Sequence, residues 1–330
     1  MKKVALGFSV PKEILGELDK ELGGLYEFHT FEPRHYDSGL LRSAEVLVLL
    51  SSNEKVISEA SSCKWIHSWS AGVDEYLCLD RFKRDAAPIL THSGGSFGPQ
   101  ISEHVFAMVF AFTRSIKTIS LDQERKKWVS RPPRDNHGEL SEMTGRTMGI
   151  IGVGHVGLEI AKRAKSFGLR VIGVRRDVSE KFRIQELGAY VDEVHSLQEL
   201  KVVLAKSDIV VDALPLTGET KGLFDRSKFH DFKDGAIFVN VGRGGTVVEG
   251  DLVDALQRGT VKYAALDVFE EEPLPRNSPL WEMENVLVSP HCAGRSDKLD
   301  TRAFSILKEN LERYAKNIPL LNRVDMKAGY

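Results

Sequence analysis

The sequence has few cysteines and no long apolar run. Its 330 residues include three cysteines, Cys63, Cys78 and Cys292, which are widely separated and lack the spacing of metal ligands. The longest uninterrupted apolar stretch, Val105 to Phe112, is far shorter than the roughly 18 residues of a membrane-spanning helix. We therefore expect a reduced, cytoplasmic protein without disulfides, metal or a membrane segment.

The chain also lacks an excess of charge of either sign. It has 45 Lys and Arg against 47 Asp and Glu, a formal net charge of -2 with neutral histidines. Proteins that bind nucleic acid or anionic membranes through surface charge carry a clear basic excess. We therefore expect a small-molecule partner rather than nucleic acid or membrane.

Short apolar runs alternate with amphipathic segments, which is typical of α/β proteins with parallel sheets. In the first part of the chain, strands are predicted at 4–8, 46–50, 65–66 and 89–91, with a helix at 11–22. A second series of strands is predicted at 147–151 and near 170–174, 209–213, 236–240, 263–267 and 286–289. We expect two Rossmann-like domains with doubly wound parallel sheets, the first of them flavodoxin-like.

Two helical segments are expected where the domains join. Apolar residues recur at helical spacing from Ile101 to Ile116, so one helix should begin near Pro99. The other, 299–314, is expected to return to the first domain. The predicted domains are a discontinuous substrate domain, residues 1–98 and 296–330, and an inserted NAD(P)-binding domain, residues 99–295.

A glycine-rich turn follows the first strand of the second series. Gly152, Gly154 and Gly157 have the spacing of a dinucleotide-binding turn, and a helix with an apolar face follows them. Such glycines allow a tight turn, close approach of the main chain to a pyrophosphate, and packing of the helix on the strand. The helix N-terminus would offer N–H groups to the phosphates.

The next strand ends without the acid that usually binds the ribose hydroxyls of NAD. Arg175 and Arg176 stand there instead, and a guanidinium can hold a 2′-phosphate in a bidentate grip. We therefore predict NADP as the preferred coenzyme. The alternative is two solvated surface arginines with NAD bound less selectively, and Asp177 would favour NAD if it turned inward.

A cation, a carboxylate and an imidazole follow the last three apolar runs. Arg243, Glu272 and His291 should share one rim, because ligands bind beyond the carboxyl ends of parallel strands. A guanidinium can hold a carboxylate and polarise a carbonyl, and an imidazole beside a carboxylate can exchange a proton near neutrality. Each residue alone could be structural, but together they predict hydride transfer to a small anionic substrate.

The ordered motifs resemble the D-isomer-specific 2-hydroxyacid dehydrogenases. The matching segments are 152–157, 214–220, 240–244, 266–273 and 289–294, with a looser match at 70–74. The resemblance implies that Arg243 binds substrate, that His291 is the acid/base and that Glu272 is its partner. It implies substrate contacts for Ala71, Gly72 and Val73. With Arg175 and Arg176, the implied coenzyme contacts are Gly152, Gly154, His155, Val156, Gly157, Leu214, Pro215, Thr220, Val241, Gly242, Asp267, His291 and Gly294.

The reaction implied by the resemblance is NAD(P)H-dependent reduction of a small 2-oxo acid, such as glyoxylate or hydroxypyruvate, to the D-2-hydroxy acid. A short 3-phosphoglycerate dehydrogenase is an alternative, because thirty-nine residues after His291 leave no room for an appended regulatory domain. A non-enzymatic coenzyme-sensing scaffold, similar to the corepressors that resemble this family, is a further alternative. The sequence shows no low-complexity flanks that would support it.

Two smaller expectations complete the sequence-based interpretation. The family commonly dimerises through its coenzyme domains, so we expect a homodimer, with the polar loop from 130 to 145 as an arm. Cys292 stands where the family commonly has an aliphatic residue. It is either a small packing residue or a redox-sensitive thiol beside the imidazole.

Overall fold

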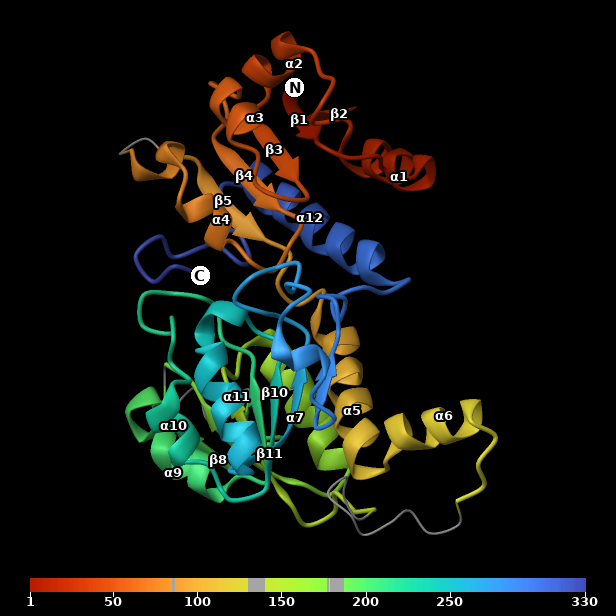
Figure 1. Cartoon of the computed structure of the whole chain (residues 1–330). Helices are drawn as coiled ribbons and strands as arrows, with labels where there is room; N and C mark the ends of the chain where they lie inside the picture. The colour runs from red at the N-terminus through yellow and green to blue at the C-terminus, as the bar shows by residue number, and fades with distance from the viewer. Residues whose placement is uncertain (85–86, 130–139, 177, 179–186) are drawn as a thin grey trace. The chain divides into compact units, whose positions relative to one another are not determined.

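The computed structural model describes residues 1–84, 87–129, 140–176, 178 and 187–330. Contacts within the chain divide it into two compact units. Unit 1 comprises Met1–Phe97 and Ser296–Tyr330, and unit 2 comprises Gly98–Arg295. Each unit is an α/β structure built on its own parallel sheet (Figure 1).

Unit 1 contains a five-stranded sheet in the order β2-β1-β3-β4-β5, with all pairs parallel. This is the flavodoxin-like order. Its strands are β1 (Lys2–Leu6), β2 (Tyr26–Thr30), β3 (Val46–Leu49), β4 (Trp65–Ser68) and β5 (Ile89–His92). Its helices are α1 (Lys12–Leu22), α2 (Ser38–Ser43), α3 (Glu54–Glu59), α4 (Asp74–Leu77) and, from the end of the chain, α12 (Leu299–Ala315).

Successive strand residues of unit 1 enter opposite cores, because side chains alternate across a sheet. Val46 and Val48 belong to one core with the α12 residues Phe304, Leu307 and Leu311. Leu47 and Leu49, which alternate with them, belong to the second core, on the other face of the sheet. Two tyrosine hydroxyls fix α12 further: Tyr26 donates to the Leu311 carbonyl at 2.7 Å, and Tyr314 donates to Glu45 at 3.0 Å.

Unit 2 contains a seven-stranded parallel sheet in the order β12-β11-β10-β9-β6-β7-β8. Its strands are β6 (Thr147–Ile151), β7 (Arg170–Val174), β8 (Glu193–His195), β9 (Ile209–Asp212), β10 (Ala236–Asn240), β11 (Val261–Leu266) and β12 (Val286–Val288). Its helices are α5 (Gly98–Thr113), α6 (Ile116–Glu124), α7 (His155–Ser166), α9 (Leu200–Lys206), α10 (Arg226–His230) and α11 (Glu249–Arg258). This is the Rossmann order extended by one strand.

Helices cover both faces of the unit 2 sheet. Ile150 enters a core with residues of α5 and α7, whereas Ile151 enters a core with residues of α9 and α11. Both faces of the sheet are therefore buried, which explains why its strands appear in the sequence as continuous apolar runs rather than as alternating apolar and polar residues.

The structure corrects one helix and adds two strands. The helix predicted to include Ile116 ends at Thr113, and α6 begins after Ser115, which has a φ of 53°. The Thr113 carbonyl accepts the Ser141 amide at 2.9 Å, so it does not continue the helical ladder. Strands β2 and β8 were not predicted, because both are edge strands with polar residues at alternate or flanking positions.

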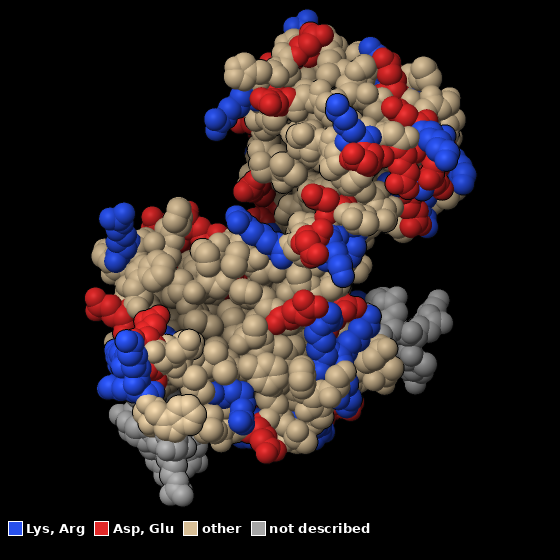
Figure 2. Space-filling model, turned by 90° about the vertical axis from the view of Figure 1, so that its right-hand side faces the viewer, with Lys and Arg blue, Asp and Glu red and all other residues tan. Residues whose placement is uncertain are grey.

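Charged residues of both signs are interspersed over the face shown in Figure 2. None of the helices in the described part of the chain combines the length and hydropathy that a membrane crossing requires.

Candidate active site

The glycine-rich turn, residues 152–157, lies where the strand order of unit 2 reverses. Strand β6 is flanked by β7 on one side and by β9 on the other, so the chain crosses over here to the other half of the sheet. Open α/β sheets bind ligands at such a topological switch point. Gly152 has a φ of 103°, and a Cβ there would lie 2.8 Å from the Ala213 carbonyl oxygen after β9. The two loops of the switch point are therefore in direct main-chain contact.

The other two glycines of the turn have different surroundings. A Cβ on Gly157 would overlap the Gly152 carbonyl, so this glycine is needed for packing of α7. A Cβ on Gly154 would meet nothing within 4 Å, and Gly154 caps the N-terminus of α7. The open space beside this helix end fits the pyrophosphate of a dinucleotide. His155 is exposed in the first turn of α7, and Val156 packs partly against the core.

The loop after β9 is closed by its own threonine. The Thr220 hydroxyl donates to the Pro215 carbonyl at 2.6 Å and accepts the Thr217 amide at 2.8 Å. The Leu214 amide donates to Asp212 at 3.0 Å. Leu214, Pro215 and Thr220 thus form one fixed loop beside the glycine turn.

At the end of β7, the two arginines have different environments. Arg175 is partly buried, and its amide donates to the His195 carbonyl at 3.1 Å. Arg176 is exposed, and its Nη2 lies 3.3 Å from Glu219 Oε2. A carboxylate therefore stands beside the cation predicted to meet a 2′-phosphate. Asp177 lies outside the described residues.

His291 and Glu272 form a close pair. Nδ1 of His291 lies 2.7 Å from Glu272 Oε2, and Glu272 Oε1 accepts the Phe269 amide at 3.0 Å. Because a carboxylate only accepts hydrogen bonds, Nδ1 carries the proton of this contact. Nε2 is left as the nitrogen that can exchange a proton with a ligand.

Arg243 lies on the same sheet edge as this pair. It follows β10, and the Glu272 and His291 loops follow β11 and β12, the next two parallel strands. The loops are in contact, because a Cβ on Gly244 would overlap the Phe269 carbonyl. The sheet thus brings the cation, carboxylate and imidazole to one edge.

The main chain around Arg243 is tightly held. Nη1 of Arg243 donates to the Gly242 carbonyl at 2.8 Å, and the Gly242 amide donates to the Asn240 side chain at 3.0 Å. A Cβ on Gly242 would lie 2.6 Å from the Leu214 carbonyl oxygen. The Val241 amide donates to the Asp212 carbonyl at 3.0 Å. Val241 and Gly242 thus tie the Arg243 turn to the loop after β9.

Asp267, at the end of β11, is buried and already accepts several hydrogen bonds. Its Oδ1 accepts the Ser289 hydroxyl at 2.6 Å and the Cys292 amide at 3.0 Å, and its Oδ2 accepts the Ala293 amide at 3.0 Å. These bonds fix the carboxylate beside the His291 loop. The carbonyl of Gly294, at the end of this loop, accepts a hydrogen bond from the side-chain amide of Gln100 at 3.0 Å.

The Ser289 hydroxyl connects Asp267 with two further side chains. It lies 2.9 Å from His104 Nε2 and 3.3 Å from Cys292 Sγ. His104, Asp267 and Cys292 place potential metal ligands within 4.8 Å of one another, but this hydroxyl lies within hydrogen-bonding range of all three. The cluster therefore forms a hydrogen-bond network around Ser289, and Cys292 is a partly buried member of it.

The predicted substrate loop belongs to unit 1. Ala71 and Gly72 are partly exposed and Val73 is buried, in the turn between β4 and α4. The Gly72 amide donates to the Ser70 hydroxyl at 3.2 Å. The remaining site residues named above belong to unit 2.

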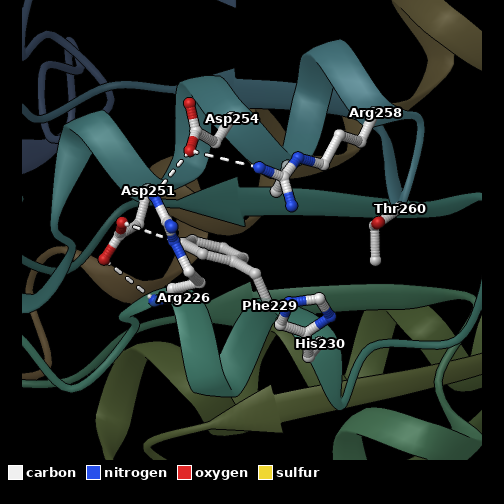
Figure 3. Close-up of a pocket in the computed structure, with 8 residues that line it drawn as sticks. Arg226, Phe229, His230, Asp251, Asp254, Arg258 and Thr260 are labelled. Atoms are coloured by element: carbon white, nitrogen blue, oxygen red, sulfur yellow. Dashed lines mark hydrogen bonds and ion pairs between the residues drawn. The ribbon is translucent and has the colours of Figure 1, made fainter.

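A small pocket between α10 and α11 contains none of the predicted site residues. In Figure 3, Arg226 lies between Asp251 and Asp254. Arg226 Nη2 is 2.6 Å from Asp254, and Arg258 Nη2 is 3.8 Å from the same carboxylate. Its arginines are thus paired within the pocket.

Comparison with known proteins identifies the family. The model for "D-isomer specific 2-hydroxyacid dehydrogenase, NAD binding domain" matches residues 106–293, more than half of the chain. The chain belongs to the D-isomer specific 2-hydroxyacid dehydrogenases. The fold and family predicted from the sequence are thereby confirmed.

Relatives in this family have different named activities. The chain is 31% identical over 285 residues to D-3-phosphoglycerate dehydrogenase of Archaeoglobus fulgidus, covering 86% of this chain and 51% of the relative. It is 32% identical to glyoxylate reductase of Aeropyrum pernix, covering 96% of both chains. The chain thus spans about half the length of the phosphoglycerate dehydrogenase relatives it matches.

Solved structures of the family have the same fold. A family protein from Aeromonas salmonicida aligns with a TM-score of 0.84 at 33% identity, covering 98% of this chain and 99% of that one. An NADPH-dependent glyoxylate/hydroxypyruvate reductase from Sinorhizobium meliloti, in complex with NADP and sulfate, aligns with a TM-score of 0.78 at 27% identity and covers 100% of both chains.

Several polar residues that support the candidate site were not predicted from the sequence. Asp212, Asn240, Thr246 and Ser289 hold the site loops through the hydrogen bonds of their side chains. Asp212, Asn240 and Ser289 share one sequence signal, a polar residue at the end of an apolar run, whereas Thr246 follows a pair of glycines and lacks it. That signal marks the edge of a sheet but does not identify hydrogen-bond partners.

Proposed function

We propose that the chain reduces a small 2-oxo acid, of the size of glyoxylate or hydroxypyruvate, to the D-2-hydroxy acid with a nicotinamide coenzyme. The observation that carries this proposal is the 2.7 Å contact between His291 and Glu272 on the sheet edge that also holds Arg243. We assign substrate binding to Arg243 and proton exchange to His291, with Glu272 as its partner.

The proposed mechanism gives each side chain one task. When bound, the coenzyme supplies the hydride. Arg243 binds the substrate carboxylate and polarises the carbonyl, since its guanidinium is always charged. His291 delivers a proton from Nε2 to the developing alkoxide, and Glu272 keeps the ring oriented through Nδ1. Ala71, Gly72 and Val73 are proposed to contact the substrate carboxylate.

The coenzyme is proposed to be NADP, with NAD as a weaker alternative. Arg175 and Arg176 stand where an NAD enzyme carries an acid, and the Sinorhizobium relative was solved with NADP. The residues from Gly152 to Gly157, with Leu214, Pro215, Thr220, Val241, Gly242, Asp267, His291 and Gly294, are proposed to line the coenzyme site. Accordingly, we propose residues 99–295 as the coenzyme domain and 1–98 with 296–330 as the substrate domain.

A phosphorylated substrate is the second candidate, because phosphoglycerate dehydrogenases are among the relatives. The loops after β4 and β5, residues 69–73 and 93–97, contain no Lys or Arg, however. A phosphate dianion needs cationic partners, so this feature favours the smaller, unphosphorylated acid.

A coenzyme oxidation assay tests these proposals. NADPH and NADH are each combined with glyoxylate, hydroxypyruvate, pyruvate and 3-phosphohydroxypyruvate. We expect the highest kcat/KM with NADPH and one of the first two acids. Preferential turnover of 3-phosphohydroxypyruvate would establish the second candidate, and turnover of none of the four would refute the proposed reaction.

We further propose a homodimer formed through unit 2. Helix α6 has no buried residue, its Ile116 and Ile119 side chains are about half exposed, and Trp128 is 95% exposed. An exposed apolar surface of this kind is typical of an interface. Part of the predicted arm, 130–139, lies outside the described residues. Sedimentation of the wild type and of a Trp128→Ser, Ile119→Ser variant tests the assignment, and a wild-type monomer would refute it.

A further inference from the structure

Asp212 is a buried carboxyl group that the proposed mechanism does not use. It is the last residue of β9, at the switch point of the unit 2 sheet, and its exposed fraction is 0%. Its main chain pairs with Ile151 of β6 and Asn240 of β10. A carboxyl group in such a position is costly unless it is neutral or fully hydrogen-bonded.

The two oxygens of this carboxyl group contact the loop after β9 and the Arg243 turn. Oδ1 accepts the Leu214 amide at 3.0 Å, and Oδ2 lies 2.5 Å from the Thr246 hydroxyl. The same hydroxyl lies 2.6 Å from the Arg243 carbonyl oxygen. Asp212, Thr246 and Arg243 thus form a continuous hydrogen-bonded chain.

The hydrogens available in this chain favour a neutral Asp212. A threonine hydroxyl has one hydrogen to donate, and the Arg243 carbonyl can only accept. If Thr246 donates to Arg243, the 2.5 Å contact with Asp212 needs a hydrogen on Oδ2. An ionised Asp212 would draw the hydroxyl hydrogen to itself and leave two oxygens 2.6 Å apart without a hydrogen between them.

The electrostatic surroundings favour the same state. Burial raises the pKa of Asp212 to about 7, although the hydrogen bonds from Thr246 and from the Leu214 amide oppose the shift. The residues paired with Asp212, Ile151 and Asn240, do not titrate. The segments that follow the flanking strands, 152–157 and 241–246, contribute His155 and Arg243 as their charged or titratable residues.

We propose that Asp212 is a positioning residue: as a neutral acid it donates to Thr246, which donates to the Arg243 carbonyl and so fixes the turn that presents the guanidinium. The proposal rests on the proposed function, because it takes Arg243 as the substrate-binding residue. Ionisation of Asp212 would withdraw the Thr246 hydroxyl from the Arg243 carbonyl, which would keep only the longer bonds from the Thr246 amide at 3.2 Å and the Asn240 side chain at 3.3 Å. The turn would then be held less firmly, and the guanidinium would bind the substrate carboxylate less well.

Three variants test the proposal in the full-length protein. Asp212→Asn keeps a neutral donor toward Thr246, Thr246→Ser keeps the hydroxyl, and Thr246→Val keeps the shape without it. Thr246→Val is expected to raise KM for the 2-oxo acid about ten-fold at pH 6, the effect of one lost hydrogen bond, with a smaller change in kcat. Thr246→Ser should restore most of the affinity.

The pH profile separates positioning from a purely structural role. In the wild type, KM for the 2-oxo acid should rise as Asp212 ionises near pH 7. In Asp212→Asn this rise should vanish, because the amide does not ionise. A profile of Asp212→Asn that superimposes on the wild type, or a Thr246→Val variant with unchanged KM, would overturn the proposal.

Infrared spectroscopy provides a readout that needs no turnover. The wild-type spectrum at pH 5 should contain the carbonyl band of one protonated carboxylic acid that Asp212→Asn lacks and that disappears at pH 9. Absence of this band overturns the proposal even if the enzyme is active. If the band is present but the protein turns over no 2-oxo acid, Asp212 is a neutral acid as proposed. In that case the proposed function is refuted, rather than the protonation of Asp212.

Discussion

The guanidinium of Arg176 forms an ion pair with the carboxylate of Glu219, Nη2 to Oε2 at 3.3 Å. Arg176 follows β7, whereas Glu219 lies in the loop after β9, so the contact joins the two sides of the switch point. Both side chains are largely exposed, and such pairs contribute little to stability. A phosphate group could therefore replace Glu219 as the partner of Arg176.

Because of this contact, substitutions of Arg176 and of Glu219 should change KM for NADPH in opposite directions. Arg176→Ala should raise KM for NADPH about ten-fold, the effect of one charged hydrogen bond. Glu219→Gln should lower it by about two- to five-fold, because a like charge beside the 2′-phosphate is removed. KM for NADH should change little in either variant.

Steady-state kinetics with both coenzymes checks this pair of effects. Glu13→Gln, on α1 of unit 1, is a matched control for the change in net charge. An equal fall in KM for NADPH in Glu13→Gln would show that the charge of the whole protein, rather than Glu219, sets the effect. Equal losses for NADPH and NADH in Arg176→Ala would contradict the 2′-phosphate assignment.

Replacement of Glu272 by Gln should reduce turnover. The carboxylate accepts from both His291 Nδ1 and the Phe269 amide. A glutamine has one acceptor oxygen, so its NH2 group would face one of these donors and break that bond. Loss of ring orientation should lower kcat by about ten- to hundred-fold, less than the effect of roughly 10²–10⁴ expected for His291→Ala.

The neighbouring acid provides the control for this prediction. Glu271→Gln removes the same charge from an exposed side chain and should retain wild-type kcat. Coenzyme affinity, measured by fluorescence titration, should be similar in Glu271→Gln and Glu272→Gln. A fall in kcat for Glu271→Gln as large as that for Glu272→Gln would mean that general charge, not the contact with His291, determines turnover.

The sequence carries much of the fold because both sheets are buried on both faces. Strands such as β9 and β10 therefore appear in the sequence as unbroken apolar runs. The end of each run marks the carboxyl end of a strand, which is the edge of a parallel sheet where ligands bind. The positions of Arg243, Glu272 and His291 after successive strands could be predicted for this reason. Edge strands such as β2 and β8 lack this signal, since part of each is exposed to solvent.

The supporting contacts could not be predicted because they depend on tertiary neighbours. Asp212 and Thr246 are 34 residues apart and meet only through the order of the strands. At the break after Thr113, its carbonyl accepts the Ser141 amide, which lies well beyond α6 in the sequence. The pairing of Arg176 with Glu219 has a similar origin, 43 residues apart. Periodicity indicates which face a residue occupies, not which distant group will bond to it.

Two glycines of the glycine-rich turn, Gly154 and Gly157, should respond differently to alanine. Gly157→Ala should destabilise unit 2 by at least about 1–3 kcal/mol, because the added Cβ overlaps the Gly152 carbonyl. Gly154→Ala should leave the melting temperature almost unchanged, since the added Cβ meets no described atom within 4 Å. It should nevertheless weaken coenzyme binding, because it fills the space proposed for the pyrophosphate.

Thermal unfolding without coenzyme and calorimetric titration with NADPH distinguish the two effects. Gly250→Ala, a glycine of α11 whose added Cβ also meets nothing within 4 Å, is the control for the substitution itself. A Gly154→Ala variant that binds NADPH like the wild type would show that the pyrophosphate lies elsewhere.

Asp212 predicts a specific dependence of stability on pH. Its pKa is raised from 3.8 to about 7 in the folded chain, so folding takes up a proton between these values. The contribution of this group to the free energy of unfolding is therefore largest below about pH 4, falls as the pH rises through 7, and is constant above that. The total change is at most roughly 4 kcal/mol.

The Asp212→Asn variant isolates this contribution, because the other titrating groups are common to both proteins and cancel in the difference. The variant should gain stability relative to the wild type as the pH rises from 5 to 8. Urea unfolding at the two pH values, monitored by circular dichroism, measures the difference. This pH dependence is opposite to that of a carboxylate stabilised by a salt bridge. Removing such a carboxylate lowers the free energy of unfolding most at high pH. A stability difference that is the same at pH 5 and pH 8 would show that the buried carboxyl does not change protonation on folding.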